Sequence, residues 1–259
     1  MTITKVFTDF KEFDVEGSGY APQGDIKLDG ETIEDHDQIK LLMTVASLSN
    51  DANLIENNGL YEITGDPTEG AMLTLAEKWG IVQEDLNEAH PRIDEIPFDS
   101  DRKMMTTFHE MDGTYYAMTK GAPDIMINNS SKIMIDGKLE DFTEDMKRQV
   151  LEENTKLAKQ ALRVMAYSFK PYETLEGEEL TTENIEREMV FVGLTGMIDP
   201  PRPEARAAVA ECHNSGIDVI MITGDYFETA LAIAKDLGIA EREDQAMQGS
   251  DLNNKSEEE

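Results

Sequence analysis

The sequence predicts an α+β fold, in which an antiparallel β-sheet flanked by helices is followed by a segment of alternating helix and strand. Short β-rich segments at 91–97, 103–110 and 114–119 favour the antiparallel sheet, and Glu-Met-Asp-Gly-Thr at 110–114 is a hairpin signal. The pattern changes to alternation after the proline cluster at 200–203. With 259 residues, 39% of them hydrophobic, the chain can bury a core as one large domain or two modest ones.

Two helices are predicted before these strands. Residues 2–15 alternate as one or two strands, and apolar residues then recur at helical spacing over 37–49. A second helix is expected to begin at Pro67, with Asp66 as its N-cap. Glu69 follows Asp66 by three residues and is expected to complete a capping box.

The middle of the chain continues the same domain. Residues 143–161 have a helical pattern, and 162–170 and the apolar run 189–198 are predicted as strands, the second of them buried. The acidic residues 171–186 between the two strands are expected to form a loop.

The C-terminal part predicts a different architecture. Residues 204–216 and 226–237 are expected to be helices, and the apolar run 217–222 between them is expected to be a buried strand of a parallel sheet. We place the domain boundary in the proline cluster, which gives a first domain at 1–201 and a second domain at 202–259.

Net charge, cysteine and histidine content and apolar run length exclude several classes of function. A net charge of −31 argues against partners that carry phosphate backbones or anionic lipids, so nucleic acid is not an expected partner and a bound polyanion needs a local basic pocket. Cys212 is the only cysteine, which excludes an internal disulfide, and four His residues do not suggest a zinc site. The longest apolar run, 189–198, falls short of the roughly 20 residues that cross a bilayer, and the first residues lack a secretory signal. We expect the chain as given to be soluble.

Thr-Lys-Gly-Ala-Pro-Asp at 119–124 places Lys120 at a strand end and opens a helix. Gly121 permits close approach of the backbone, Pro123 suits the first helical turn, and free amides at a helix start favour an anion. The alternative is an ordinary strand-to-helix turn with a solvated lysine.

Two further side chains suit a nucleotide but have ordinary alternatives. Phe98 is followed by a polar run, so its ring is a candidate to stack on a nucleobase, and the alternative is a core phenylalanine at a strand end. Arg163 has the planar fork that binds phosphate, and the alternative is an ion pair with one of the many surface carboxylates.

Thr223, Gly224 and Asp225 follow the predicted strand 217–222. Ligands bind at the carboxyl ends of strands in open α/β sheets, so a hydroxyl and a backbone amide here suit a phosphoryl oxygen. Asp225 is also placed to cap the next helix, with Glu228 completing a capping box, and both roles are compatible.

Six sequence blocks follow one another along the chain. They are Gly-Asp-Pro-Thr-Glu-Gly-Ala-Met (65–72), Pro-Phe-Asp-Ser-Asp-Arg-Lys-Met-Met (97–105), Thr-Lys-Gly-Ala-Pro-Asp (119–124), Leu-Arg-Val-Met-Ala-Tyr-Ser-Phe (162–169), Gly-Leu-Thr-Gly-Met-Ile-Asp-Pro-Pro-Arg-Pro-Glu (193–204) and Val-Ile-Met-Ile-Thr-Gly-Asp (219–225). Blocks of this kind in this order resemble P-type ATPases, and they look most similar to the bacterial relatives of calcium pumps. The resemblance covers nearly the whole chain.

The resemblance implies a nucleotide-binding domain inserted into a phosphorylation domain of the haloacid dehalogenase type. It implies that Glu69 lies near the adenine amino group and that Phe98 stacks on the ring. Lys120 and Gly121 are expected to line the floor of an ATP pocket, and Arg163 is expected to meet the phosphates.

The resemblance also assigns roles near the domain boundary. Thr223, Gly224 and Asp225 are expected to contact the transferring phosphoryl group, and Asp199 and Arg202 to belong to the hinge between the domains. The partners implied are ATP or ADP and the phosphorylation, actuator and transmembrane domains of a cation pump.

The sequence departs from the family at two places. Animal calcium pumps carry an arginine where this chain has Ser100, so a phosphate contact is either missing or supplied by Arg102. The Asp-Lys-Thr-Gly-Thr segment that accepts the phosphoryl group and the Gly-Asp-Gly-x-Asn-Asp segment that helps to hold magnesium occur nowhere in the 259 residues.

We therefore expect a piece of a membrane pump, on the cytosolic side, that binds ATP without phosphorylating itself. One alternative is a haloacid dehalogenase-like phosphatase, which needs an aspartate nucleophile segment that we do not find before Met221. The other is an acidic interaction module that binds a basic partner and no nucleotide.

Overall fold

The chain divides into two compact units, each of which we describe by itself. The computed structural model describes residues 1–176, 180–198, 203–223 and 227–247. The first unit comprises residues 1–157 and 163–198, and the second comprises 158–162 and 199–259. The predicted boundary at 201–202 lies outside the described residues.

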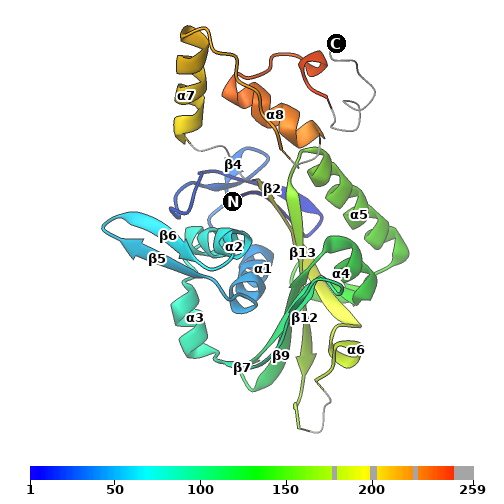
Figure 1. Cartoon of the computed structure of the whole chain (residues 1–259). Coiled ribbons are helices and arrows are strands. Elements are labelled where there is room, and N and C mark those ends of the chain that lie inside the picture. Colours follow the sequence, from blue (N-terminus) through cyan, green and yellow to red (C-terminus); the bar gives the residue numbers. More distant parts are fainter. Residues whose placement is uncertain (177–179, 199–202, 224–226, 248–259) are drawn as a thin grey trace. The chain divides into compact units, whose positions relative to one another are not determined.

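An 11-stranded sheet forms the centre of the first unit (Figure 1). Its strand order is β4-β3-β2-β1-β13-β12-β9-β8-β7, with β10 beside β13 and β11 beside β10. Neighbouring strands are antiparallel except for β10 and β13, which are parallel. The strands are β1 (Thr2–Thr8), β2 (Lys11–Val15), β3 (Ile26–Leu28), β4 (Glu31–Thr32), β7 (Arg92–Asp99), β8 (Met104–Met111), β9 (Thr114–Gly121), β10 (Ser130–Ile135), β11 (Lys138–Asp141), β12 (Arg163–Tyr172) and β13 (Met189–Ile198).

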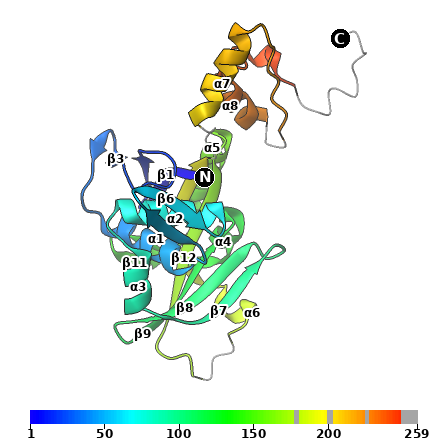
Figure 2. The same ribbon diagram turned by 60° about the vertical axis from the view of Figure 1, so that its left-hand side comes forward.

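Helices cover both faces of this sheet (Figures 1 and 2). On one face, α1 (Asp37–Leu48), α2 (Pro67–Lys78) and α3 (Gln83–Ala89) pack over a core that includes Met118 and Tyr167. On the other face, α4 (Pro123–Asn129) and α5 (Glu144–Lys159) pack over Phe191 and Leu194, and α6 (Thr182–Ile185) packs near Phe108. The predicted antiparallel sheet flanked by helices is therefore confirmed.

The β8–β9 hairpin has the turn that its sequence predicts. Asp112 and Gly113 both have positive φ, at 53° and 79°, which is the requirement of a two-residue type I′ turn. The sequence analysis did not predict the β3–β4 hairpin, the small hairpin of β5 (Asn53–Asn57) and β6 (Leu60–Thr64), helix α3 or the β10–β11 hairpin. The predicted loop 171–186 contains the short helix α6.

The second unit contains α7 (Pro203–Asn214), α8 (Phe227–Leu237) and a short 3₁₀ helix (Glu243–Gln245). The two α-helices match the sequence prediction. The buried strand predicted at 217–222 is wrong, because residues 217–223 form no strand and Ile217, Ile220 and Ile222 are 56%, 82% and 92% exposed. An apolar run becomes a strand only when a neighbouring strand receives its hydrogen bonds, and the described residues of this unit supply no such neighbour.

Candidate functional site

Lys120, at the end of β9, is the most buried cation of the predicted site. Its side chain is 6% exposed, and its Nζ donates hydrogen bonds to the Ser49 carbonyl and to Oε1 of Glu69. Burial lowers the pKa of Lys120, and the charge of Glu69 opposes that effect only in part. Lys120 is therefore a nearly buried ammonium that a single carboxylate partly neutralises.

Glu69 joins the end of α1 to the start of α2. Its Oε2 accepts a hydrogen bond from the Asp51 amide at 3.3 Å, and the Asn50 side chain donates to the Glu69 carbonyl at 3.0 Å. Asn50 is itself buried and also donates to the Ala46 carbonyl. The carboxylate is thus held between two helix ends, with Lys120 beneath it.

The first turn of α2 also receives Arg163, from the start of β12. Nη1 of Arg163 donates to Oγ1 of Thr68 at 3.0 Å. Asp66 caps α2 by accepting from the Thr68 amide at 2.7 Å; burial alone would raise the pKa of Asp66, but these hydrogen bonds and the charge of Arg163 lower it. The predicted capping box is wrong in its second half, because the carboxylate of Glu69 is directed to Lys120 and not back to the helix start.

A second arginine, which the sequence analysis missed, closes this cluster. Arg92, at the start of β7, donates to Oδ1 of Asp51 at 2.7 Å, to the Asn50 carbonyl at 2.7 Å and to Oε2 of Glu95 at 2.5 Å. Only Glu95 is close in sequence; the other two partners lie 41 and 42 residues away. No local pattern marks such a pairing in advance.

Phe98, near the end of β7, is 63% exposed. This exposure contradicts the alternative that Phe98 is a core residue. β7 pairs with β8 at Ile96–Thr106 and again at Asp99–Met104, so Pro97 and Phe98 together lie opposite Met105, which pairs with Lys120. Phe98 and Lys120 are therefore two strand spacings apart, about 10 Å.

Gly121 allows β9 to pass close to the turn that follows β7. A Cβ atom at Gly121 would lie 2.7 Å from the Lys103 carbonyl oxygen and 2.7 Å from Cγ of Met104. The next amide, of Ala122, donates to the same Lys103 carbonyl at 3.0 Å. Helix α4 then packs into the core on the face away from α1, so its first turn does not share the surroundings of the Lys120 side chain.

Arg102 is not brought to this cluster. Its guanidinium donates to Oε1 of Glu186 at 2.5 Å, to the Pro97 carbonyl at 2.5 Å and to the Met104 carbonyl at 3.0 Å. Glu186 lies 84 residues away, on the segment that follows α6. The idea that Arg102 replaces the arginine missing at Ser100 thus requires the guanidinium to leave three acceptors.

The residues expected near the domain boundary belong to the second unit. Thr223 is exposed at the end of the irregular segment 217–223. Asp199, Arg202, Gly224 and Asp225 lie outside the described residues.

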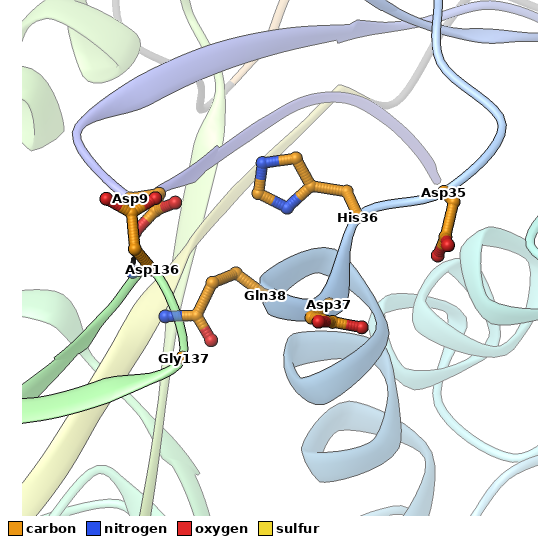
Figure 3. Close-up of a pocket in the computed structure, with 7 residues that line it drawn as sticks. All are labelled: Asp9, Asp35, His36, Asp37, Gln38, Asp136 and Gly137. Atoms are coloured by element: carbon orange, nitrogen blue, oxygen red, sulfur yellow. Dashed lines mark hydrogen bonds between the residues drawn. The ribbon is translucent and has the colours of Figure 1, made fainter.

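A polar cavity of about 320 Å³ lies at the start of α1, lined by residues other than the cluster around Lys120 (Figure 3). Its walls are Asp9, Asp35, His36, Asp37, Gln38, Asp136 and Gly137. Four aspartates repel a phosphate, so this cavity does not suit a nucleotide. Within the part of the chain that the structure describes, no three acidic, cysteine or histidine side chains are grouped to hold a metal ion.

Comparison with known proteins gives a consistent result. A family model described as "P-type ATPase, cytoplasmic domain N" matches residues 38–204. The chain is 41% identical to a protein named calcium-transporting ATPase from Bacillus subtilis (strain 168), over all of this chain and 29% of that protein. It is also 38% identical to the cation-transporting ATPase pma1 of Synechocystis sp. (strain ATCC 27184 / PCC 6803 / Kazusa), over 93% of this chain and 27% of that protein.

The chain spans less than a third of the length of these relatives. Among the residues with described structure, no helix is long and apolar enough to cross a membrane. The matched residues 38–204 contain α1 except for its first residue, α2, the strands that carry Phe98 and Lys120, and β12 with Arg163. The chain therefore belongs to the P-type ATPase family and contains its cytoplasmic domain N.

Proposed function

We propose that this chain binds ATP beside Phe98 and the Lys120 cluster, as the nucleotide-binding domain of a cation-transporting P-type ATPase. The observation that carries the proposal is a set of three side chains: the exposed ring of Phe98, the nearly buried Lys120, and Arg163 of β12, which donates to the first turn of α2. The chain has a net charge of −31, so two cations in one cluster are unusual in it.

Each side chain has a chemical task in this proposal. The ring of Phe98 stacks on adenine, for which ~1–3 kcal/mol is typical of base–aromatic contacts. Glu69 lies near the adenine amino group and accepts from it. Lys120 and Gly121 line the floor; two of the three N–H donors of Lys120 are bonded to Ser49 and Glu69, so the third is left for a ligand. Arg163 turns its fork from Thr68 toward the phosphates.

The remaining steps belong to the whole protein. There the γ-phosphate passes to an aspartate in an Asp-Lys-Thr-Gly-Thr segment, and Thr223, Gly224 and Asp225 contact the transferring group. The hinge at Asp199 and Arg202 joins the nucleotide-binding domain, residues 1–201, to the phosphorylation domain. Phosphorylation drives transport of a cation, which we propose to be calcium from the names of the relatives, with this chain on the cytoplasmic side of the membrane.

Magnesium belongs to the same phosphoryl-transfer step in the family. Among the described residues, no three acidic, cysteine or histidine side chains are placed to hold a metal ion, so we assign no magnesium ligand and derive no step through the ion. Arg102 is likewise not assigned as a phosphate ligand, because its guanidinium is bonded to the Pro97 carbonyl of β7, the Met104 carbonyl of β8 and Glu186.

The test is a titration of the purified chain with ATP, ADP and GTP, without and with magnesium, followed by calorimetry or NMR shifts. We expect weak binding that prefers adenine; a millimolar dissociation constant corresponds to about −4.1 kcal/mol. Phe98→Ala is expected to weaken ATP and ADP alike, by about 5-fold or more, because the stack is common to both. Ile93→Ala, another exposed apolar side chain of β7, is the matched control and should bind like the parent chain.

Two results would count against the proposal. Unchanged affinity in Phe98→Ala removes Phe98 from the site. An absence of binding at millimolar ATP, together with salt-sensitive capture of a basic partner, supports the acidic interaction module instead.

A further inference from the structure

Arg102 lies in the 100–103 turn, which begins two residues after Phe98, and ties that turn to a distant segment. Nη1 donates to Oε1 of Glu186 at 2.5 Å and to the Met104 carbonyl at 3.0 Å, and Nη2 donates to the Pro97 carbonyl at 2.5 Å. Pro97 directly precedes Phe98, and Met104 begins β8. One guanidinium therefore joins the end of β7 to the start of β8, on either side of the 100–103 turn.

Glu186 is the inner partner of this ion pair. Its side chain is 1% exposed, against 17% for Arg102. Oε1 also accepts from Oγ1 of Thr106 at 2.9 Å, and Thr106 in turn contacts Thr119 at 2.9 Å. Oε2 of Glu186 is buried and has no hydrogen-bond partner among the described residues. An ion pair with an unpartnered oxygen is an expensive way to stabilise a fold, which points to a role in fixing geometry.

Apart from Arg102, one hydrogen bond fixes the 100–103 turn to the sheet: the Ala122 amide donates to the Lys103 carbonyl at 3.0 Å. The other contacts of the turn are short-range. The amides of Asp101 and Arg102 donate to Oδ1 of Asp99 at 3.0 and 2.9 Å, and the Lys103 amide donates to the Asp99 carbonyl at 2.6 Å. These contacts are local to the turn. Lys103 has a φ of 55°, a conformation that a residue with a side chain holds only when its surroundings impose it. The bond from the Ala122 amide acts on Lys103 directly, and the side chain of Arg102 adds a second long-range contact, to Glu186.

We propose that Arg102 and Glu186 are positioning residues for the adenine site: the pair fixes the turn so that the exposed ring of Phe98 keeps one orientation for stacking. This inference rests on the proposed ATP-binding function. It assigns Arg102 an indirect effect through the Phe98 ring, and not a contact with phosphate. A ring held in its binding conformation loses less freedom on binding, so the pair is expected to raise nucleotide affinity.

The test uses two conservative variants of the whole chain. Arg102→Lys keeps the charge but cannot reach three acceptors at once, and Glu186→Gln keeps the shape but removes the charge. Each is expected to weaken ATP, ADP and AMP by the same factor, about fivefold. Arg148→Lys on α5, where the arginine is 63% exposed and paired with Asp145, is the control and should leave all three affinities unchanged.

A double-mutant cycle separates positioning from direct phosphate contact. In a Phe98→Leu background, Arg102→Lys is expected to weaken binding no further, because its effect acts through the ring that has been removed. A loss that grows from AMP to ATP, or one that adds fully to Phe98→Leu, would overturn the proposal in favour of a phosphate ligand. Unchanged affinity in both conservative variants would overturn it as well.

Hydrogen exchange tests the positioning without any nucleotide. In Glu186→Gln, the amides of Asp101, Arg102 and Lys103 are expected to exchange about tenfold faster, while those of β13 keep their protection. Equal protection of the turn in both proteins rejects the positioning role even if the parent chain binds no ATP. Failure of the parent chain to bind ATP, with faster exchange in the variant, instead rejects the proposed function and leaves Arg102 as a fixture of the turn.

Discussion

Two buried ion pairs lie across the same point of the sheet from opposite faces, and their burial is reversed. In the pair on the α1 face, the cation is the inner member: Lys120 is 6% exposed and Glu69 is 14% exposed. In the pair on the other face, the carboxylate is the inner member: Glu186 is 1% exposed and Arg102 is 17% exposed. Because Thr106 and Met105 are adjacent on β8, their side chains point to opposite faces, as do those of Thr119 and Lys120 on β9.

This difference in burial indicates which substitution in each pair costs the fold more stability. An outer member that loses its partner can hydrate, whereas an inner member that loses its partner is left as a charge with little access to water. The inner cation Lys120 suits the floor of the proposed ATP pocket, where a ligand can contact it. The inner carboxylate of Glu186 suits a fixed partner for Arg102, which holds the 100–103 turn in place.

The strongest test of this contrast is Arg102→Met, which removes the outer member and strands Glu186. We expect the free energy of unfolding to fall by about 3–5 kcal/mol, the usual cost of breaking a buried pair from one side. Urea denaturation at neutral pH measures it. Arg148→Met breaks an exposed pair with Asp145, at 2.8 Å, and is expected to cost about 0.5 kcal/mol or less. Similar losses in the two variants would mean that burial does not distinguish the pairs.

A smaller change in stability is expected for Lys120→Met, which removes the inner member of the other pair. Glu69 keeps its hydrogen bond from the Asp51 amide and is exposed enough to hydrate, and a methionine fills much of the space of the lysine. We expect the free energy of unfolding to fall by about 1–2 kcal/mol, the usual cost of leaving a buried acceptor such as the Ser49 carbonyl without its donor. The loss stays below that of Arg102→Met because the stranded carboxylate is the outer member of its pair. ATP affinity is expected to fall about tenfold or more.

The prediction for Lys120→Met is tested by measuring ATP affinity and stability separately. Calorimetric titration measures affinity, and the same urea experiment measures stability. A large loss of stability with full ATP binding would make Lys120 a structural residue and would remove it from the proposed site.

The contrast also shows what the sequence could predict. Local chemistry predicted the Asp112–Gly113 turn and the Asp66 cap of α2, because each depends on residues a few positions apart. The missed β5–β6 hairpin carries the same kind of signal at Asn58 and Gly59, with φ values of 55° and 81°. That element was predictable and was overlooked.

The ion pairs were not predictable in the same way. Lys120 and Glu69 are 51 residues apart, and Arg102 and Glu186 are 84 residues apart, so their pairing depends on how strands and helices assemble. Resemblance to a family drew attention to Lys120, Glu69 and Arg102, but nothing in the chain drew attention to Glu186. The prediction of a strand at 217–222 was wrong for the opposite reason. The composition of this run suits a strand, but the described residues around it include no neighbouring strand to pair with it.

The smallest expected effect is the pH dependence that Glu186 gives to stability. Burial raises the pKa of Glu186 above its usual range, and the hydrogen bond from Thr106 and the charge of Arg102 offset this only in part. The folded chain therefore holds the proton of Glu186 more tightly than the unfolded chain does.

It follows that the contribution of Glu186 to stability is full below the ordinary carboxyl pKa and is lost as pH rises through the raised pKa. Glu186→Gln removes this titration. The free energy of unfolding of the parent chain, relative to that of Glu186→Gln, is expected to fall as pH rises from about 4 to 7. Glu183→Gln, which removes an exposed carboxylate from α6, is the reference for the change in net charge. If this difference in the free energy of unfolding instead rises with pH, the charge of Arg102 more than offsets the burial of Glu186. The Arg102–Glu186 ion pair would then stabilise the fold by its charges and not only by fixing the turn.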